Sequence, residues 1–382
     1  MRAYPASAAL LIASIAVLTA CSSSAPSSGT NTPGVTLQSP VVTGTVSVTC
    51  SDSTSDAATL QQAINSSPAG AAIEIKGGTC LLTRGISLLG DRTYVGASRT
   101  GTVLEQDGNM GYVLASDTYV NNSSTTGQPL TISNLTVRCN GSGSTDGIII
   151  LNWHTDVQDV DVRNCGGSGI VDTNTTANGT AITNTSVNSR FENNFISDSG
   201  QYGFEVYDSG NSVTDGYLVD NQIASSGQDA IHLGNAAGWN ISGNHLYGDA
   251  GDAINANRLY GTTIYGNHIE DFGLGPQSGT WYGITGTAQG GMGSTISGNT
   301  IANNNGEAAG ASYIYIAITR TNYSTAYLSA TGNILLGVRS DDVGFFFNGG
   351  ANKLVVTSSG NKVARAGTAS RNAGDVTVTH GT

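Results

Sequence analysis

Short runs of alternating apolar and polar residues recur at a constant interval in the middle of the chain. Between residues 218 and 269, three such runs carry an Asn in the same place, at Asn221, Asn244 and Asn267, and both intervals are 23 residues. Alternation with a period of two predicts β-strands that bury one face. A repeat of this length, with Gly and Asn between the runs, is typical of a coiled parallel sheet in which each repeat forms one coil.

The same register extends toward both ends of the chain and defines one position per coil, which we call the Asn column. Its members are Leu135, Val160, Asn194, Asn221, Asn244, Asn267, Asn299, Asn333 and Asn361. Several intervals are longer than 23 residues, which predicts loops at the other corners, because a strand cannot lengthen without breaking its pairing. Stacked Asn side chains can exchange amide hydrogen bonds between coils, so we assign this column to structure and not to chemistry.

A second column follows from this register where the next strand begins, eight residues after the Asn column in the central coils. We call it the acid column, and its members are Asp146, Ser168, Tyr202, Asp229, Asp252 and Tyr282. A small residue and an inward apolar residue follow each member, so alternation predicts that the residue three positions further faces outward. The polar residues at these outward positions are Glu205, His232 and Asn255.

The acid column is the candidate for chemistry. Neighbouring coils lie about 4.8 Å apart, so Asp229 and Asp252 should be near neighbours, with Glu205 and His232 beside them. Two carboxylates at that distance cannot both ionise freely, and the raised pKa of one supplies a proton donor beside a carboxylate base, as hydrolysis of a glycosidic bond requires. The alternative is structural, because an Asp at the start of a strand often accepts backbone N–H groups. We expect Asp146 to have that role.

The loop at 271–281 is expected to form a wall beside the acid column. Trp281 and Tyr282 end this loop, and their aromatic faces suit stacking on a sugar ring. The alternative for Trp281 is packing against its own coil. His245 and His268 lie one coil apart next to the Asn column. Because the pair has no evident carboxylate or third ligand, we expect a stacked surface pair and no metal site.

Residues 1–21 are interpreted as a signal peptide. An apolar run at 8–17 follows Arg2 and is too short to span a membrane. It ends in Leu-Thr-Ala-Cys, which resembles the bacterial lipoprotein signal, so Cys21 would be the lipidated first residue of the mature protein. Residues 22–40 are rich in Ser, Thr, Pro and Gly and predict a flexible tether. We therefore expect an exported lipoprotein, held at the outer membrane or cell surface by its lipid anchor alone.

Residues 41–100 are predicted to form an N-terminal cap and the first coils, and residues 101–382 the body of the coil and its C-terminal coils. Ser55 and Asp56 can cap a short helix that ends near Asn65. Placed before the first coil, such a helix would cover an open sheet end. Strand-like runs follow at 72–75, 85–89, 93–95 and 102–104.

Composition agrees with a turn-rich β protein, because 52 of the 382 residues are Gly and only 11% are charged. The net charge is -12 and the chain has only three Lys, so it cannot neutralise a phosphate backbone, and nucleic acid is a poor partner. The same lack of cations disfavours a polyanionic sugar unless Ca²⁺ bridges the acids. In an oxidising compartment Cys50 can pair with Cys80 and Cys139 with Cys165; reduced, buried thiols are the alternative.

The chain from about residue 101 to 363 resembles the pectin-lyase-like right-handed parallel β-helix superfamily, and residues 77–80 resemble the N-terminal cap of its secreted members. The resemblance implies an all-β fold, a single-stranded right-handed parallel β-helix with a short N-terminal capping helix. Polygalacturonase-type hydrolases are the nearest functional template, with Asn-Thr-Asp-Gly, Asp-Asp, Gly-His-Gly and Arg-x-Lys on successive coils. The corresponding segments here are Gln201-Tyr202-Gly203, Gln228-Asp229 and Gly251-Asp252-Ala253. The Arg-x-Lys pair is missing, which favours a less charged polysaccharide.

We therefore expect a monomeric, surface-anchored glycoside hydrolase that degrades a neutral or weakly charged polysaccharide and needs no cofactor. Asp229 and Asp252 are the expected acid and base, and Glu205 supports or replaces one of them. The residues expected to position substrate are Tyr202, His232, Asn255, Arg258, Trp281 and Tyr282. One alternative is a polysaccharide lyase or epimerase, in which a Tyr, His or Arg abstracts a proton beside a uronate that Ca²⁺ neutralises. The other is a non-catalytic surface module.

Overall fold

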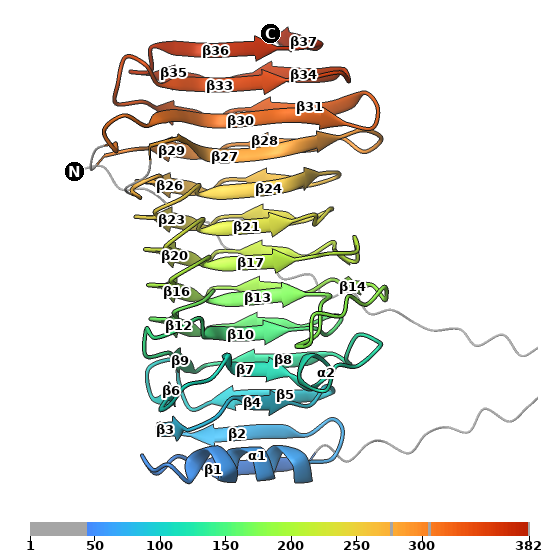
Figure 1. Cartoon of the computed structure of the whole chain (residues 1–382), viewed down its shortest axis with the longest axis vertical. Helices are drawn as coiled ribbons and strands as arrows, with labels where there is room; N and C mark the ends of the chain where they lie inside the picture. Colours follow the sequence, from blue (N-terminus) through green and yellow to red (C-terminus); the bar gives the residue numbers. More distant parts are fainter. Residues whose placement is uncertain (1–43, 276–277, 305–306, 381–382) are drawn as a thin grey trace, which may run out of the picture. The chain divides into compact units, whose positions relative to one another are not determined.

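The computed structural model describes residues 44–275, 278–304 and 307–380. The predicted signal peptide with Cys21 and the tether at 22–40 lie outside these residues, so both stay predictions. In the described part of the chain, no helix is long and apolar enough to cross a membrane. Each complete coil adds one strand to each of three parallel sheets (Figure 1), which confirms the expected all-β parallel β-helix.

Sheet 1 carries the first and the last described strands. In order of pairing, its 13 strands are β1 (Thr45–Thr49), β2 (Ala72–Lys76), β5 (Arg92–Gly96), β8 (Leu130–Ser133), β11 (Asp156–Gln158), β15 (Arg190–Glu192), β19 (Tyr217–Val219), β22 (Asn240–Ser242), β25 (Thr263–Tyr265), β28 (Ser294–Ser297), β31 (Ala326–Thr331), β34 (Leu354–Ser359) and β37 (Val376–His380). A separate two-stranded sheet pairs β14 (Ser186–Val187) with β18 (Val213–Thr214).

Sheets 2 and 3 have 11 strands each. Sheet 2 contains β4 (Ile86–Leu88), β7 (Tyr112–Ser116), β10 (Asp146–Ile150), β13 (Ile170–Thr173), β17 (Phe204–Tyr207), β21 (Ile231–Gly234), β24 (Ile254–Leu259), β27 (Thr280–Gln289), β30 (Ser312–Asn322), β33 (Val343–Asn348) and β36 (Thr368–Ala373). Sheet 3 contains β3 (Gly78–Leu82), β6 (Thr102–Gln106), β9 (Thr136–Arg138), β12 (Asp161–Arg163), β16 (Phe195–Ser197), β20 (Gln222–Ala224), β23 (His245–Tyr247), β26 (His268–Glu270), β29 (Thr300–Ala302), β32 (Ile334–Leu336) and β35 (Lys362–Ala364).

The interior of the coil is a stack of apolar side chains, one from each strand of a coil. In sheet 1, Leu218, Ile241 and Ile264 are in register on neighbouring strands, and all three are fully buried. Burial of each such side chain contributes roughly 1.5–3 kcal/mol. The alternation seen in the sequence thus places one residue of each short strand in the core and its neighbours outside.

The Asn column is confirmed. Asn244 lies fully buried at its centre. Its Oδ1 accepts hydrogen bonds from the backbone N–H and the side-chain amide of Asn221, each at 3.0 Å. Its Nδ2 donates to the carbonyl of Leu218 at 2.9 Å and to Oδ1 of Asn267 at 3.0 Å. The same pattern recurs along the column up to Asn361, so the amides form a continuous ladder that fixes the register of the coils.

Helix α1 (Asp56–Ser66) begins where the sequence predicts and packs against β1, β3 and β4. Its apolar face is buried through Leu60 and Ile64. The predicted cap is wrong in one respect, because Ser55 makes no side-chain capping hydrogen bond. The carboxylate of Asp56 instead accepts N–H groups of the preceding turn and the N–H of Leu81, so it joins the helix to the first coil. Helix α2 (Asp117–Val120) is a single turn after β7.

Both predicted disulfides form. Cys50 pairs with Cys80, which joins the segment before α1 to β3, and Cys139 pairs with Cys165 one coil further on. The four predicted strand runs at 72–75, 85–89, 93–95 and 102–104 correspond to β2, β4, β5 and β6. The second run is shorter than predicted, because β4 covers only Ile86–Leu88.

Candidate active site

The acid column lies along the edge of sheet 2 at which its strands begin. Backbone pairing confirms its register, because the N–H of Gly203 donates to the carbonyl of Asp229, and the N–H of Ala230 donates to that of Asp252. Small residues follow the column because space there is short: a Cβ on Gly203 would lie 2.3 Å from a methyl carbon of Ile223. Consecutive members therefore stack one coil apart, at about 4.8 Å.

Each Asp of the column accepts a backbone N–H from the next coil through its Oδ1. The bonds are Ser168 to Asp146 at 2.7 Å, Asp252 to Asp229 at 2.9 Å and Tyr282 to Asp252 at 2.8 Å. The structural role expected for Asp146 is thus confirmed. Because one oxygen of Asp229 and of Asp252 has the same role, each carboxyl is held in a fixed orientation.

The second oxygen distinguishes Asp229 and Asp252 from Asp146. Oδ2 of Asp229 lies 2.9 Å from Nδ1 of His232. Oδ2 of Asp252 accepts a long hydrogen bond of 3.4 Å from Nδ2 of Asn255. The coil of Asp146 has a buried Ile at the equivalent position. Two of the three acids therefore direct an oxygen toward polar groups on the outer face of sheet 2.

Burial determines the protonation of these acids. It raises the pKa of Asp252 well above the usual value, and the neighbouring carboxyl of Asp229 raises it further. Burial also raises the pKa of Glu205, against the effect of a 2.8 Å hydrogen bond from the Ser168 hydroxyl. Asp252 is therefore the carboxyl of the pair that keeps its proton to higher pH than an ordinary Asp.

The outer face of sheet 2 is polar in the middle of the sheet. There Glu205, His232 and Asn255 pair in register, as predicted. On the coils before this stretch, the outward residues Ala115, Ile149 and Val171 form a buried apolar cluster. On the coils after it, a second apolar cluster contains Ile314, Ala317 and Val343. Glu205, His232 and Asn255 thus occupy a polar stretch between two apolar patches.

Two cavities flank the contact between Asp229 and His232. The first, about 560 Å³, is lined by Asp229, Gln228 and Trp281. The second, about 550 Å³, is lined by His232, Asn257 and Arg320. Both volumes lie in the range of small-molecule sites, about 300–1,000 Å³. Asp229 therefore lines one cavity and His232 the other.

The predicted aromatic residues surround this pair at different depths. The ring of Tyr202 stacks on that of His232, with centroids 4.4 Å apart and an angle of 26° between the planes. Trp281 was expected either to stack on a sugar ring or to pack against its own coil. Its side chain is partly buried against the core, and it also lines the first cavity, so its position fits both alternatives. Tyr282 packs against the second apolar cluster, and burial and the nearby Asp252 raise its pKa.

Arg258 lies away from the acids. Its guanidinium donates to the side-chain oxygen of Gln289 and lies 5.4 Å from the ring centre of Tyr260. Arg258 lines two further cavities, one of which shares Asn257 and Thr287 with the cavity of His232. Its role in substrate binding therefore stays a prediction. The cation that shares a cavity with His232 is Arg320, which sequence reasoning missed. A bulge shifts the register between β27 and β30 in front of Arg320, and no sequence signal marks that bulge.

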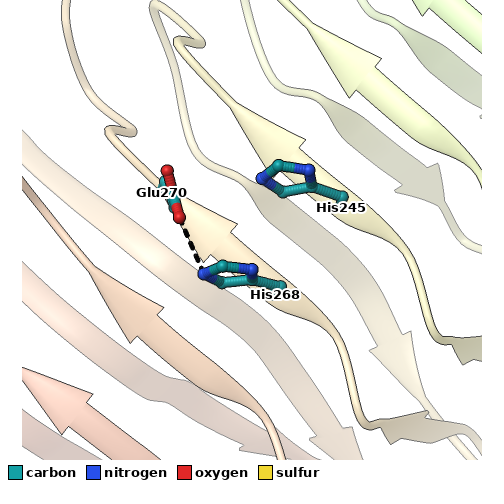
Figure 2. A group of neighbouring side chains, drawn as sticks. All are labelled: His245, His268 and Glu270. Carbon is teal, nitrogen blue, oxygen red and sulfur yellow. Dashed lines mark ion pairs between the residues drawn. The ribbon is translucent and has the colours of Figure 1, made fainter.

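His245 and His268 lie on sheet 3, not on the sheet that carries the acid column. Their rings stack with centroids 4.9 Å apart and 13° between the planes, which confirms the predicted stacked pair. The expectation that no carboxylate accompanies them is wrong. Oε1 of Glu270 lies 2.8 Å from Nε2 of His268 (Figure 2). Glu270 follows His268 by two residues on the same strand, so strand alternation places both side chains on one face.

Comparison with solved structures identifies the same architecture in proteins of low sequence identity. The A-module of a mannuronan C-5 epimerase from Azotobacter vinelandii has a TM-score of 0.53 at 14% identity, over 85% of this chain and 95% of that one. A DFA-IIIase from Arthrobacter chlorophenolicus has a TM-score of 0.54 at 11% identity, over 84% and 83% of the two chains. An Acinetobacter phage tailspike has a TM-score of 0.60 at 10% identity, over 88% of this chain and 62% of that one.

These likenesses show the fold, which agrees with the resemblance noted from the sequence. Comparison with curated proteins gives no match. A family model described as the right handed beta helix region matches residues 178–381, more than half of the chain. The stacked coils, the Asn column and this match lead to one conclusion: the chain belongs to the right-handed β-helix family.

Proposed function

We propose that this protein is an exported, lipid-anchored glycoside hydrolase that cleaves a neutral or weakly charged polysaccharide. One observation carries the proposal. Asp229 lines a cavity, contacts His232, which lines a second cavity, and stacks one coil below Asp252, whose pKa burial raises. A carboxylate beside a carboxyl group of raised pKa is the pairing that glycosidic bond hydrolysis uses.

In this proposal the two acids have different roles. Asp252 donates its proton to the leaving glycosidic oxygen, because burial raises its pKa well above that of an ordinary Asp and its Oδ2 accepts only the 3.4 Å bond from Asn255 among the described residues. Asp229 attacks the anomeric carbon as nucleophile. The spacing of one coil, about 4.8 Å, is closer to the about 5–5.5 Å of retaining enzymes than to the about 6.5–9.5 Å of inverting enzymes. We therefore expect retention of configuration.

The remaining residues position the sugar. Trp281 presents an aromatic surface to one cavity, where it can stack on a ring. Tyr202 holds His232 in a stacked arrangement, and the Asp229 contact sets which edge of the imidazole faces the second cavity. A carbohydrate polymer is a known ligand of this architecture, since one similar structure is a mannuronan C-5 epimerase. Glu205 accepts a hydrogen bond from the hydroxyl of Ser168 and supports the site from the coil below.

A second candidate function is elimination or epimerisation at a uronate sugar. It is favoured by the presence of His232 and Arg320 in the same cavity. Arg320 can pair with a uronate carboxylate, and His232, oriented by Asp229 through Nδ1, can abstract the adjacent proton with its other nitrogen. This alternative needs one imidazole and one guanidinium where the hydrolase needs two carboxyls.

The two functions are separated by incubating the full chain with a panel of neutral and uronate-containing polysaccharides. Hydrolysis is expected to produce reducing ends without ultraviolet absorbance. A lyase produces an unsaturated sugar that absorbs in the ultraviolet, and an epimerase changes the sugar composition without cleavage. Reducing ends from a neutral polymer support the proposal. Ultraviolet-absorbing products from uronate polymers alone would replace it with the second function.

The pH dependence of activity should follow from the raised pKa of Asp252. The hydrolase needs Asp252 protonated, and an ordinary Asp loses its proton at about pH 4. Because the pKa of Asp252 is raised, kcat/KM is expected to persist well above that pH. It should then fall as pH rises through the raised pKa of Asp252. The profile is measured on the full chain and on the Glu205→Gln variant, which should keep the same alkaline limb. A rate that rises steadily from acidic to alkaline pH would instead indicate a base such as His232.

A further inference from the structure

A second group of polar side chains lies on the outer face of sheet 3. His245 on β23 and His268 on β26 are direct register partners on neighbouring strands. Glu270 follows two residues after His268 on the same face. Backbone hydrogen bonds between the parallel strands and the Asn ladder hold these two strands in register. The backbone positions of the three residues are therefore fixed relative to each other.

The ligand atoms of this group converge. One donor atom from each of His245, His268 and Glu270 can be chosen so that all three lie within 4.8 Å of one another. Figure 2 shows both imidazoles with the same edge turned toward the side of Glu270. Nε2 of His245 is buried and has no hydrogen-bond partner among the described residues. A buried nitrogen without a partner is costly unless another group or ion satisfies it.

We propose that His245, His268 and Glu270 bind one divalent transition-metal ion, with Zn²⁺ as the best fit. Two imidazoles and one carboxylate form a ligand set that Zn²⁺ accepts, and three protein ligands leave a fourth tetrahedral position for water or another donor. Mg²⁺ and Ca²⁺ prefer oxygen ligands alone. The side chain of His268 is 52% exposed, so an ion can enter from solvent.

The ligand side chains need to move only a short distance to bind a zinc ion. Ligands about 2.1 Å from Zn²⁺ in a tetrahedral site lie about 3.4 Å apart. The donor atoms here lie at most 4.8 Å apart, and the contact between His268 and Glu270 is 2.8 Å. The widest separation must therefore close by at most about 1.4 Å and the shortest must open slightly. Rotation of the exposed His268 side chain and the half-buried Glu270 side chain can supply this movement without a change in the backbone. The 2.8 Å contact between His268 and Glu270 would be exchanged for two bonds to the metal. Binding would then join neighbouring coils on sheet 3.

The test uses the full chain with Cys21→Ser, because Cys21 is the one cysteine outside the two disulfides and its thiol would compete for zinc. The protein is stripped with a chelator and titrated with Zn²⁺ by calorimetry. We expect one ion per chain. His245→Gln and His268→Gln should each weaken binding at least about 10-fold. The matched control is His154→Gln, which removes an exposed imidazole elsewhere and should leave the affinity unchanged.

Further measurements address the carboxylate and the geometry. Glu270→Gln keeps the side-chain shape but removes the charged ligand, so it should also weaken Zn²⁺ binding at least about 10-fold. Co²⁺ in place of Zn²⁺ should give the intense visible absorption of a four-coordinate site in the parent protein and not in His268→Gln. The thermal midpoint of each variant without metal shows that it is folded. Unchanged zinc affinity in folded His245→Gln and His268→Gln, or an equal loss in His154→Gln, would overturn the proposal.

Discussion

Asp229→Asn is expected to lower polysaccharide turnover by about 1,000-fold or more and to leave the thermal midpoint close to that of the parent protein. The amide is isosteric and keeps an Oδ1 that accepts the Asp252 N–H, so the backbone ladder survives. The amide cannot attack a sugar carbon or carry the charge that the proposed mechanism requires. It also places an N–H group where the carboxylate now faces Nδ1 of His232. Turnover is measured by reducing ends and stability by calorimetry.

Asp146→Asn is the matched control for this experiment. Asp146 occupies the same column and accepts the same kind of backbone N–H, from Ser168. Three residues further, its coil carries the buried Ile149 of an apolar cluster instead of a polar residue. We therefore expect Asp146→Asn to retain turnover. Similar losses in both variants, or a large drop in the thermal midpoint of Asp229→Asn, would mean that the acid column is structural throughout.

Asn244→Leu is expected to destabilise the protein by about 4 kcal/mol. Asn244 is fully buried and makes hydrogen bonds to Asn221 twice, to Leu218 and to Asn267. Leu removes all four, at about 1 kcal/mol each, and leaves buried groups without partners. Total stabilities are about 5–15 kcal/mol, so this loss is large. Urea unfolding followed by circular dichroism measures it.

Asn361→Leu provides the comparison at the end of the ladder. Asn361 makes a similar number of bonds but is only partly buried, so water can replace the lost partners. We expect a cost of about 1 kcal/mol. If Asn244→Leu and Asn361→Leu cost the same, burial of the ladder is not the source of its stability, and apolar packing alone holds the coils in register.

The fold was predictable because each coil repeats the same local sequence pattern. The constant interval between Asn221, Asn244 and Asn267 defines the register, and the register then places Asp229 above Tyr202 and below Asp252 without further information. The two apolar members at the start of the Asn column, Leu135 and Val160, did not disturb this inference, because they occupy the same buried position.

The parts of the site that could not be predicted depend on irregular backbone or on burial. Arg320 enters the cavity with His232 only because the pairing of β27 with β30 slips at a bulge. The raised pKa of Asp252 depends on how fully later coils cover it, which sequence spacing does not reveal. Glu270, in contrast to Arg320 and the pKa of Asp252, was predictable. It lies two residues after His268, and this spacing is sufficient to place its carboxylate on the same face as the histidines.

The Asn ladder anchors one corner of each coil from Asn194 to Asn361, whereas the loops between strands differ in length elsewhere. Because the ladder holds the register at that corner, loops at the other corners can vary in length without breaking strand pairing, and the intervals between its members range from 23 to 34 residues. Register is thereby fixed at one corner of each turn, and variation is confined to the others. A new binding specificity could be grafted onto this protein by loop replacement alone.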